Sequence, residues 1–270
     1  MDKRAIGIFD SGLGGLCAVR EILAILPDED IIYFGDSGRF PYGGRSYEII
    51  KKYSRQNVNF LLRQNVKIIL AACGTSSSVA INDLKKTFPD IPIIGVIEPA
   101  CEKAVEAAKK TQNKKIGVIG TLATISTGSY KNCIGALDAG CTVYSKACPL
   151  FAPLVENGHI GGDPITKLAA ERYLRDFKGL SSLILGCTHY PMIKDDIYEV
   201  TGAYLIDAGL EAAHALKGAL AARGLLSGAG KKGSLDIYIS DEGLNFRNIA
   251  SNFLGSGINC EFTQIDIEKY

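Results

Sequence analysis

Short, nearly continuous apolar runs alternate with longer amphipathic stretches along the whole chain. Runs rich in Ile, Val, Leu and Ala are typical of strands that are buried on both faces of a parallel sheet. The amphipathic stretches between them predict helices, and the alternation as a whole predicts βαβ units. We therefore expect an α/β fold built on parallel sheets.

The predicted elements follow these runs closely. Strands are expected at Ala5–Phe9, Asp30–Phe34, Lys67–Ala72, Pro92–Ile97, Lys115–Ile119, Thr142–Ala147, Ser182–Gly186, Ala203–Ile206 and Leu235–Ile239. Helices are expected at Leu16–Leu26, Tyr47–Gln64, Ser77–Lys86, Pro99–Lys110, Ser126–Ala136, Ile165–Asp176, Met192–Glu199, Leu210–Arg223 and Leu244–Phe253. The stretch Ser227–Ser234 is rich in Gly and Lys and is expected to be a loop.

Two of the apolar runs share a plan, because each ends in a cysteine that precedes a helix. The first run leads into Cys73, and the second leads into Cys187, with Pro191 placed to open the next helix. Similar Asp-x-Gly turns also follow Phe9 and Ile206. These echoes fit two similar α/β halves, one of them split in the sequence, although turns of small residues recur after strands in any α/β protein.

Composition excludes several kinds of partner. The net charge is +1 with the two signs well mixed, so neither nucleic acid nor an anionic membrane is expected to bind. No stretch approaches the roughly 18 apolar residues of a membrane helix. The basic start of the chain is followed by only a short apolar run that ends at Asp10, unlike a secretory signal. We expect a cytoplasmic protein that is not bound to membranes.

The eight cysteines form no C-x-x-C pair, and the three histidines have no spacing typical of a zinc site. Reduced thiols and no metal are therefore expected. Most of the cysteines are best interpreted as small buried apolar residues. This interpretation is kept for Cys17, Cys101, Cys133, Cys141, Cys148 and Cys260.

The segment Asp10–Cys17 offers a rival interpretation as a dinucleotide-binding glycine loop, with Asp36 near the usual place of a ribose-binding acid. Two observations oppose it. Cys17 occupies the third glycine position, and an aspartate at the strand end would repel a pyrophosphate. Neither a Walker-type phosphate loop nor a G-x-S-x-G nucleophile elbow is present.

Small hydroxyl residues and thiols follow the predicted strands, where open α/β sheets bind their ligands. Two thiols on opposite sides of a cleft suit inversion at the α-carbon of an amino acid. One thiolate removes the proton from one face, and the other thiol returns a proton to the opposite face. Cys73 and Cys187 each precede a predicted helix, whose N-terminus favours the thiolate near neutral pH. Strand-end N–H groups and the hydroxyls of Ser11, Thr75 and Thr188 would stabilise the carbanion.

At these residues the chain resembles the glutamate racemases of the aspartate/glutamate racemase superfamily. The motifs that carry the resemblance are Phe9–Gly15, Pro41-Tyr42-Gly43, Cys73-Gly74-Thr75, Ile116–Thr124, Cys148–Glu156 and Gly186–Pro191, in the order typical of that family. The resemblance implies two pseudo-symmetric α/β units of flavodoxin/Rossmann-like type, with the active site in the cleft between them. It places residues 1–97 and 208–270 in the first unit and residues 98–207 in the second.

The same resemblance implies a role for each matching residue, and it implies no cofactor. Cys73 would act on the α-proton of D-glutamate and Cys187 on that of L-glutamate, assisted by Asp10, His189 and Glu156. The residues expected around the substrate are Ser11, Pro41, Tyr42, Gly43, Gly74, Thr75, Thr121, Thr124 and Thr188. The product, D-glutamate, would supply peptidoglycan synthesis in a bacterial cytoplasm, and members of the family often form homodimers.

One position departs from the family pattern, because many members carry asparagine where this chain has Gly74. A side-chain contact to the substrate is then lost, and a serine of the 76–78 run is expected to replace it. Two other functions stay open: a related racemase, such as one for aspartate, and an amino-acid-binding descendant without activity. For single residues, structural explanations also stand. Asp10 could cap a helix, His189 could be structural, Tyr42 and Gly43 could form a turn, and Glu156 could face solvent.

Overall fold

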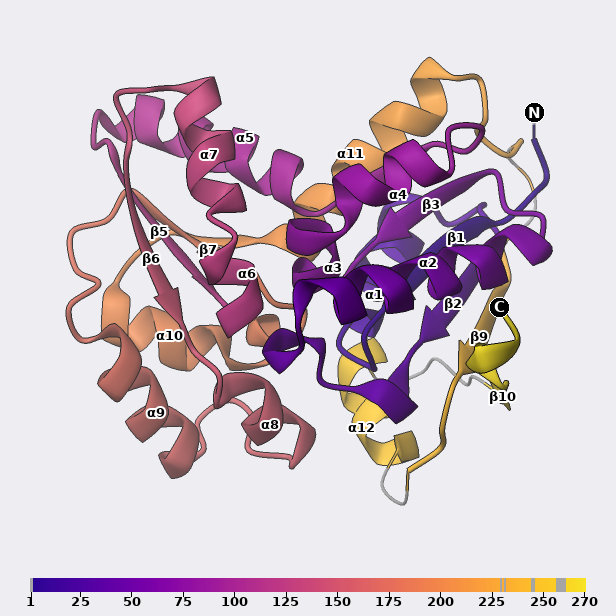
Figure 1. The fold of residues 1–270 in the computed structure, drawn as a ribbon. Coiled ribbons are helices and arrows are strands. Elements are labelled where there is room, and N and C mark those ends of the chain that lie inside the picture. The colour runs from indigo at the N-terminus through magenta and orange to yellow at the C-terminus, as the bar shows by residue number, and fades with distance from the viewer. Residues whose placement is uncertain (1, 229, 231, 244–245, 256–260) are drawn as a thin grey trace.

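The computed structural model describes residues 2–228, 230, 232–243, 246–255 and 261–270. Within these residues the strands form two sheets in which all pairs are parallel. The larger sheet has the order β10-β9-β2-β1-β3-β4, and the smaller has the order β6-β5-β7-β8. Figure 1 shows the smaller sheet with its helices on the left and the larger sheet on the right. The predicted α/β class with parallel sheets is confirmed.

The strands of the larger sheet are β1 (Ile6–Asp10), β2 (Ile31–Gly35), β3 (Ile68–Ala71), β4 (Ile93–Gly95), β9 (Leu235–Ile239) and β10 (Phe262–Gln264). Those of the smaller sheet are β5 (Lys115–Gly120), β6 (Thr142–Ala147), β7 (Ser182–Leu185) and β8 (Leu205–Asp207). Every residue of β1, β3 and β7 is buried, as the apolar runs predict for central strands. β6 at the edge is largely exposed.

The helices cover the faces of the two sheets. They are α1 (Leu16–Ile25), α2 (Tyr47–Arg63), α3 (Gly74–Val79), α4 (Ile81–Thr87), α5 (Ile97–Thr111), α6 (Leu122–Ser126), α7 (Ser129–Leu137), α8 (Phe151–Glu156), α9 (Pro164–Leu174), α10 (Lys194–Thr201), α11 (Ala208–Ala222) and α12 (Phe246–Leu254). Short 3-10 turns lie at Ser37–Arg39, Tyr42–Gly44, Tyr190–Ile193 and Ile267–Lys269. None of the described helices is long and apolar enough to cross a membrane.

Each predicted strand is found, with small changes at its ends, but some helix predictions are wrong in detail. The predicted helix Ser77–Lys86 is two helices, α3 and α4, which meet at Ala80. α5 begins at Ile97 rather than Pro99, because proline is tolerated in the first turn of a helix. β10 is an additional strand. Residues 244 and 245 of the predicted helix Leu244–Phe253 lie outside the described residues, and the helix is seen from Phe246.

The chain passes between the two sheets twice. It leaves the larger sheet after β4 through α5, and it returns after β8 through α11, which packs on both α1 and α5. On the other side of this junction, α3 packs against α6. This arrangement brings the loops that follow β1, β3, β5 and β7 together. The predicted boundaries of the two units, 97/98 and 207/208, stay a prediction.

Candidate active site

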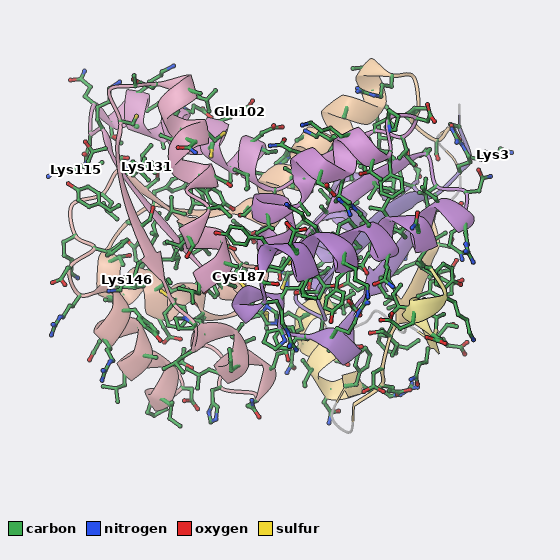
Figure 2. All side chains as sticks on the ribbon, viewed as in Figure 1. Lys3, Glu102, Lys115, Lys131, Lys146 and Cys187 are labelled. Atoms are coloured by element: carbon green, nitrogen blue, oxygen red, sulfur yellow. The ribbon has the colours of Figure 1, made fainter. Side chains whose placement is uncertain are left out.

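The loops after β3 and β7, which carry the two cysteines singled out in the sequence, touch each other. A Cβ atom placed on Gly74 would lie 2.1 Å from the carbonyl oxygen of Gly186 and 3.8 Å from the Cα atom of Cys187. The residue after Cys73 is therefore in backbone contact with the residue before Cys187. In Figure 2 the labelled Cys187 lies at the boundary between the two halves.

Cys73 is a buried thiol at the start of α3. Its sulfur accepts a hydrogen bond from the Ser76 N–H at 3.4 Å and also hydrogen-bonds to the side chain of Ser11. Burial raises the pKa of the Cys73 thiol to about 11, and the negative charge of Asp10 adds to this rise. Hydrogen bonds from the backbone and side chain of Ser76 and from the side chain of Ser11 lower the pKa without overcoming this rise. In the absence of substrate Cys73 is therefore protonated near neutral pH.

Cys187 lies beside a pair formed by the buried His189 and the partly exposed Glu156. Its Sγ atom is 3.7 Å from Nδ1 of His189, and Nε2 of the same ring is 2.8 Å from Oε1 of Glu156, at the end of α8. Burial alone would lower the pKa of His189, but its hydrogen bonds to Cys187 and Glu156 outweigh burial and raise the pKa to about 10. At neutral pH the ring is an imidazolium, which stabilises negative charge on the neighbouring sulfur.

Two aromatic rings enclose the imidazole of His189. Phe40, in the loop after β2, has its ring centroid 5.5 Å from that of His189, and Phe253 of α12 lies at 5.4 Å. No motif in the sequence marked either phenylalanine. Both phenylalanines come from the larger-sheet half, so the imidazole ring of His189 in one half is covered by apolar groups of the other. This cover keeps water from the histidine and strengthens its electrostatic effect on the thiol.

Asp10, at the end of β1, connects the two halves. Its carboxylate accepts hydrogen bonds from the Gly12 N–H at 3.1 Å and from the Thr188 hydroxyl at 3.4 Å. Burial raises the pKa of Asp10, while the charge of His189 and several backbone N–H groups oppose the rise. The N–H of Gly15, the N-cap residue of α1, also donates a hydrogen bond to the Asp10 carboxylate. Asp10 therefore satisfies N–H groups at the start of α1, as the helix-cap explanation expects, and also contacts the other half through Thr188.

Three threonines form a hydroxyl cluster across the cleft. Thr75 Oγ1 of α3 lies 2.9 Å from Thr121 Oγ1 and 3.4 Å from Thr124 Oγ1, and the last two are 3.0 Å apart. Gly43 closes the cluster from the side, since a Cβ atom there would lie 2.6 Å from Cβ of Thr121. The structure thus brings together residues that the sequence separates widely.

Pro41 and Tyr42 are placed differently from each other. Pro41 is exposed, whereas Tyr42 is fully buried and donates its hydroxyl hydrogen bond to the carboxylate of Asp36. The side-chain amide of Asn57 donates a hydrogen bond to the same hydroxyl oxygen at 3.2 Å. The hydroxyl of Tyr42 is therefore used within the fold and is not free to bind a ligand.

The carboxylate of Asp36 is also used by hydrogen bonds within the fold, so it is not available to a ribose. This removes the rival interpretation of Asp10–Cys17 as a nucleotide-binding loop. Besides the Tyr42 hydroxyl, the Asp36 carboxylate accepts hydrogen bonds from Arg39 Nε at 2.7 Å and from the Ser240 hydroxyl at 2.8 Å. Gly14 lies against the other half, because a Cβ atom there would be 2.4 Å from the Thr188 hydroxyl oxygen. A pyrophosphate would need that space. The loop after β1 is built for close packing between the halves instead.

The serines that follow Gly74 do not replace a substrate-binding side chain. Ser77 donates to the Ala71 carbonyl at 2.8 Å, and Ser78 donates to the Gly74 carbonyl at 2.7 Å. Ser76 pairs with Ser54 at 3.1 Å. All three hydroxyls are engaged inside the first half, so the expectation that one of them takes the place of an asparagine is wrong.

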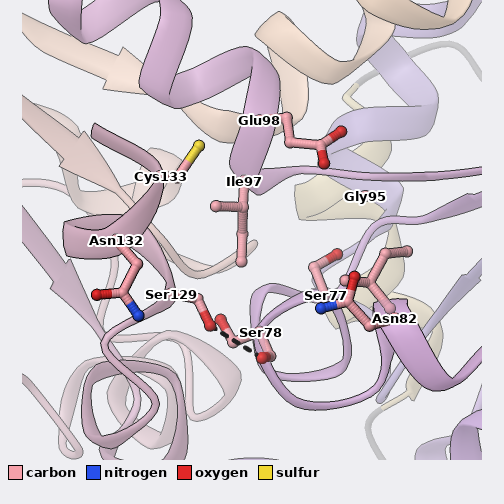
Figure 3. A pocket seen from close by; sticks show the side chains of 10 residues that line it. Ser77, Ser78, Asn82, Gly95, Ile97, Glu98, Ser129, Asn132 and Cys133 are labelled. Carbon is pink, nitrogen blue, oxygen red and sulfur yellow. Dashed lines mark hydrogen bonds between the residues drawn. The ribbon is translucent and has the colours of Figure 1, made fainter. Parts of the chain in front are cut away.

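A separate cavity of about 320 Å³ lies behind α3, on the side of α5 and α7. Figure 3 shows its lining residues, which include Ser78, Asn132 and Cys133, and neither Cys73 nor Cys187 is among them.

The interpretation of Cys17, Cys101 and Cys148 as buried residues is confirmed. Cys133 and Cys141 are partly exposed, and Cys260 lies outside the described residues. No cluster of described residues has the ligands for a metal ion.

Comparison with known proteins shows which family has a sequence similar to this chain. The family model described as Asp/Glu/Hydantoin racemase matches residues 18–216. A glutamate racemase from Aquifex aeolicus is 44% identical over 260 residues, which is 96% of this chain and 97% of that protein. A glutamate racemase from Thermoanaerobacter pseudethanolicus is 39% identical over 274 residues, with both chains covered in full.

Solved structures agree with the sequence comparison. The glutamate racemase from Francisella tularensis in complex with D-glutamate has a TM-score of 0.92, with 38% identity and full coverage of both chains. The isoform RacE1 from Bacillus anthracis has a TM-score of 0.90, with 33% identity over 98% of this chain and 99% of that one. The chain therefore belongs to the Asp/Glu/hydantoin racemase family and, within it, to the glutamate racemases.

Proposed function

We propose that this enzyme interconverts L- and D-glutamate without a cofactor, by two-base proton transfer between Cys73 and Cys187 at the α-carbon. The observation that carries the proposal is the direct contact between the two cysteine loops, one from each sheet. Two thiols held on opposite sides of one small site supply a base for one face of the α-carbon and an acid for the other. A binding protein would need neither.

The two thiols are prepared for different roles before substrate binds. Cys187 lies 3.7 Å from the imidazolium of His189, whose positive charge stabilises negative charge on the sulfur, and we assign Cys187 as the base for L-glutamate. Cys73 is kept protonated by burial and by Asp10, which makes it the acid. Starting from L-glutamate, the Cys187 thiolate takes the α-proton, and Cys73 gives its proton to the opposite face of the carbanion.

This turnover leaves Cys187 as a thiol and Cys73 as a thiolate, which is the form that accepts D-glutamate. In that direction Cys73 takes the α-proton and Cys187 returns one, so each thiol serves once as base and once as acid. His189 and Glu156 support the charge on Cys187. The Ser11 and Ser76 donors around Cys73 support its transient thiolate. Proton transfer by positioned groups of this kind contributes about 10²–10⁴-fold to a rate.

The carbanion places negative charge on the substrate's α-carboxylate, which must be met by hydrogen-bond donors. The threonine cluster of Thr75, Thr121 and Thr124 supplies hydroxyls from both halves. Thr188 and Ser11, whose hydroxyls bond to Asp10 and Cys73, would border the same site. We assign the backbone of Gly43 and Gly74 to the same site. Pro41 and the backbone of Tyr42 would border it.

Circular dichroism tests the substrate. Purified enzyme is incubated with L-glutamate or L-aspartate, without added cofactor, and the optical signal is followed to zero. We expect loss of signal with glutamate and a much slower change with aspartate, whose shorter side chain cannot reach the same contacts. A faster reaction with aspartate would make the protein an aspartate racemase. No reaction with either would favour an amino-acid-binding descendant.

The wider roles follow from this activity. D-glutamate is expected to supply peptidoglycan synthesis in a bacterial cytoplasm. The homodimer expected from the family resemblance also stays a prediction. Sedimentation velocity at micromolar concentration tests it, with a dimer expected and a single monomer species contradicting it.

A further inference from the structure

Gly74 and Gly186 bring the two cysteine loops into backbone contact at a distance that leaves no room for any side chain. A Cβ atom on Gly74 would lie 2.1 Å from the Gly186 carbonyl oxygen and 3.0 Å from its carbonyl carbon. Ordinary contacts between non-bonded heavy atoms are about 3.5–4.0 Å long. A side chain as small as that of alanine must therefore push the two loops apart by about 1 Å or more.

Gly186 cannot retreat from this contact, because it is held from behind. Its N–H donates to the Ile119 carbonyl of β5 at 2.8 Å. A Cβ atom on Gly186 would itself lie 2.7 Å from that carbonyl oxygen and 3.2 Å from the ring of Tyr130. Tyr130 is buried. The peptide of Gly186 is thus enclosed between Gly74 on one side and the smaller sheet on the other.

α3, which begins at Gly74, is held with similar firmness in the larger-sheet half. The Ser77 hydroxyl donates to Ala71 at the end of β3 and accepts from the Val96 N–H at 3.2 Å. Beyond Gly74 the same helix is tied across the cleft. Ser129 of α7 donates to the Ser78 carbonyl at 3.0 Å, as the dashed line in Figure 3 shows. Neither loop can yield alone, so added volume at Gly74 must separate the two halves.

We infer that Gly74 is a positioning residue that sets the distance between the two thiols through its contact with the Gly186 carbonyl. The inference rests on the proposed function. In two-base inversion both thiols must be within reach of one α-carbon, and reacting atoms in productive complexes are about 3–3.5 Å apart. When the loops separate, the substrate stays close to one thiol and loses the other. Proton removal continues, while delivery to the opposite face fails.

This inference makes a prediction that a general structural defect does not share. In D₂O, a thiol that removes the α-proton can exchange it with solvent and return deuterium to the same face. The recovered substrate then carries deuterium without inversion. Separated thiols favour this return over inversion. Partial unfolding would instead lower both rates by the same factor, because it only reduces the amount of active enzyme.

The test compares the wild-type enzyme with Gly74→Ala and with Gly135→Ala as a matched control. Gly135 lies in α7 and has no atom within 4 Å of the position of an added Cβ. L-glutamate is incubated in D₂O, and two initial rates are measured: D-glutamate formation, and deuterium entering the remaining L-glutamate. Thermal unfolding of each variant is recorded alongside.

For Gly74→Ala we expect inversion to fall about 100-fold, as misplacement by 1 Å predicts, and the ratio of exchange to inversion to rise at least tenfold. Gly135→Ala should keep the wild-type ratio. An unchanged ratio in Gly74→Ala would overturn the inference. A Gly74→Ala chain that does not fold would also overturn it, by making the glycine a requirement for folding. If the wild-type enzyme neither exchanges nor inverts glutamate, the proposed function itself fails.

Discussion

Nε2 of His189 lies 2.8 Å from Oε1 of Glu156, and both groups are shielded by the meeting of the two halves. The His189 side chain is 2% exposed and that of Glu156 is 22% exposed, so the pair is only weakly screened by water. The opposite edge of the same ring faces Cys187. The carboxylate therefore acts on the thiol through the charge that it maintains on the imidazole.

Glu156→Gln should slow proton removal by Cys187 at alkaline pH. Without the carboxylate the pKa of His189 falls, so the imidazolium is lost at lower pH. We expect kcat for L-glutamate to drop by about 10–100-fold, the loss typical of one charged hydrogen bond. The alkaline limb of its pH profile should also move to lower pH. Glu102→Gln, at an exposed site on α5, serves as the control. An unshifted limb would contradict this role for Glu156.

Stability should depend on pH through His189. The pKa of this residue rises from 6.5 to about 10 on folding, so the folded protein holds one more proton than the unfolded chain between these values. The stabilisation by His189 is then full below pH 6.5 and is lost as the pH rises through 10. Urea unfolding of wild type and His189→Asn from pH 6 to 10 measures it. The difference between their free energies of unfolding should shrink with rising pH, and a constant difference would refute the assignment.

Replacing each cysteine should separate exchange from inversion in opposite directions. Cys73→Ala and Cys187→Ala should each lower racemisation by about 10³-fold or more. Cys73→Ala should still exchange the α-proton of L-glutamate, through Cys187, while Cys187→Ala should still exchange that of D-glutamate. Proton NMR in D₂O follows both. Cys141→Ala, a partly exposed site at the edge of the smaller sheet, is expected to match wild type. Equal exchange of both enantiomers by either variant would contradict the assigned faces.

The threonine cluster should affect binding of the substrate's carboxylate. Thr75→Val keeps the shape of the side chain and removes the hydroxyl that lies 2.9 Å from Thr121. We expect KM for glutamate to rise about tenfold, with a smaller change in kcat, from the loss of one hydrogen bond to a charged group. Thr75→Ser should recover most of the affinity. Failure of serine to do so would mean that the site needs the methyl group and not the hydroxyl.

Much of the fold could be predicted from the sequence, because central parallel strands are buried on both faces and therefore read as apolar runs. β1, β3 and β7 are such strands. β10 was not predicted, because Phe262–Gln264 is short, largely exposed and recognisable only by its pairing with β9. The break between α3 and α4 depends on the backbone at Ala80, where no glycine or proline marks it.

The candidate site also has a part that could be predicted from the sequence and a part that could not. The cysteines, Asp10 and His189 follow strands, so their place at one edge follows from topology alone. The contacts that refine the site join segments far apart in the chain, and local sequence patterns do not encode them. Examples are the Phe253 ring against His189 and the Gly186 carbonyl against Gly74. The sequence alone indicates that Gly74 loses a side-chain contact with the substrate, whereas in the structure the backbone of Gly186 fills the space of that missing side chain.

The most direct test of the account is a single reaction of wild-type enzyme with L-glutamate in D₂O, without cofactor, stopped before a tenth of the substrate has reacted. The two-thiol account predicts that the D-glutamate formed carries deuterium at the α-carbon, because the proton comes from Cys73 after exchange with solvent. Unreacted L-glutamate should stay largely protonated. D-glutamate that keeps the original α-proton would mean that one group carries it from face to face, and would contradict the account.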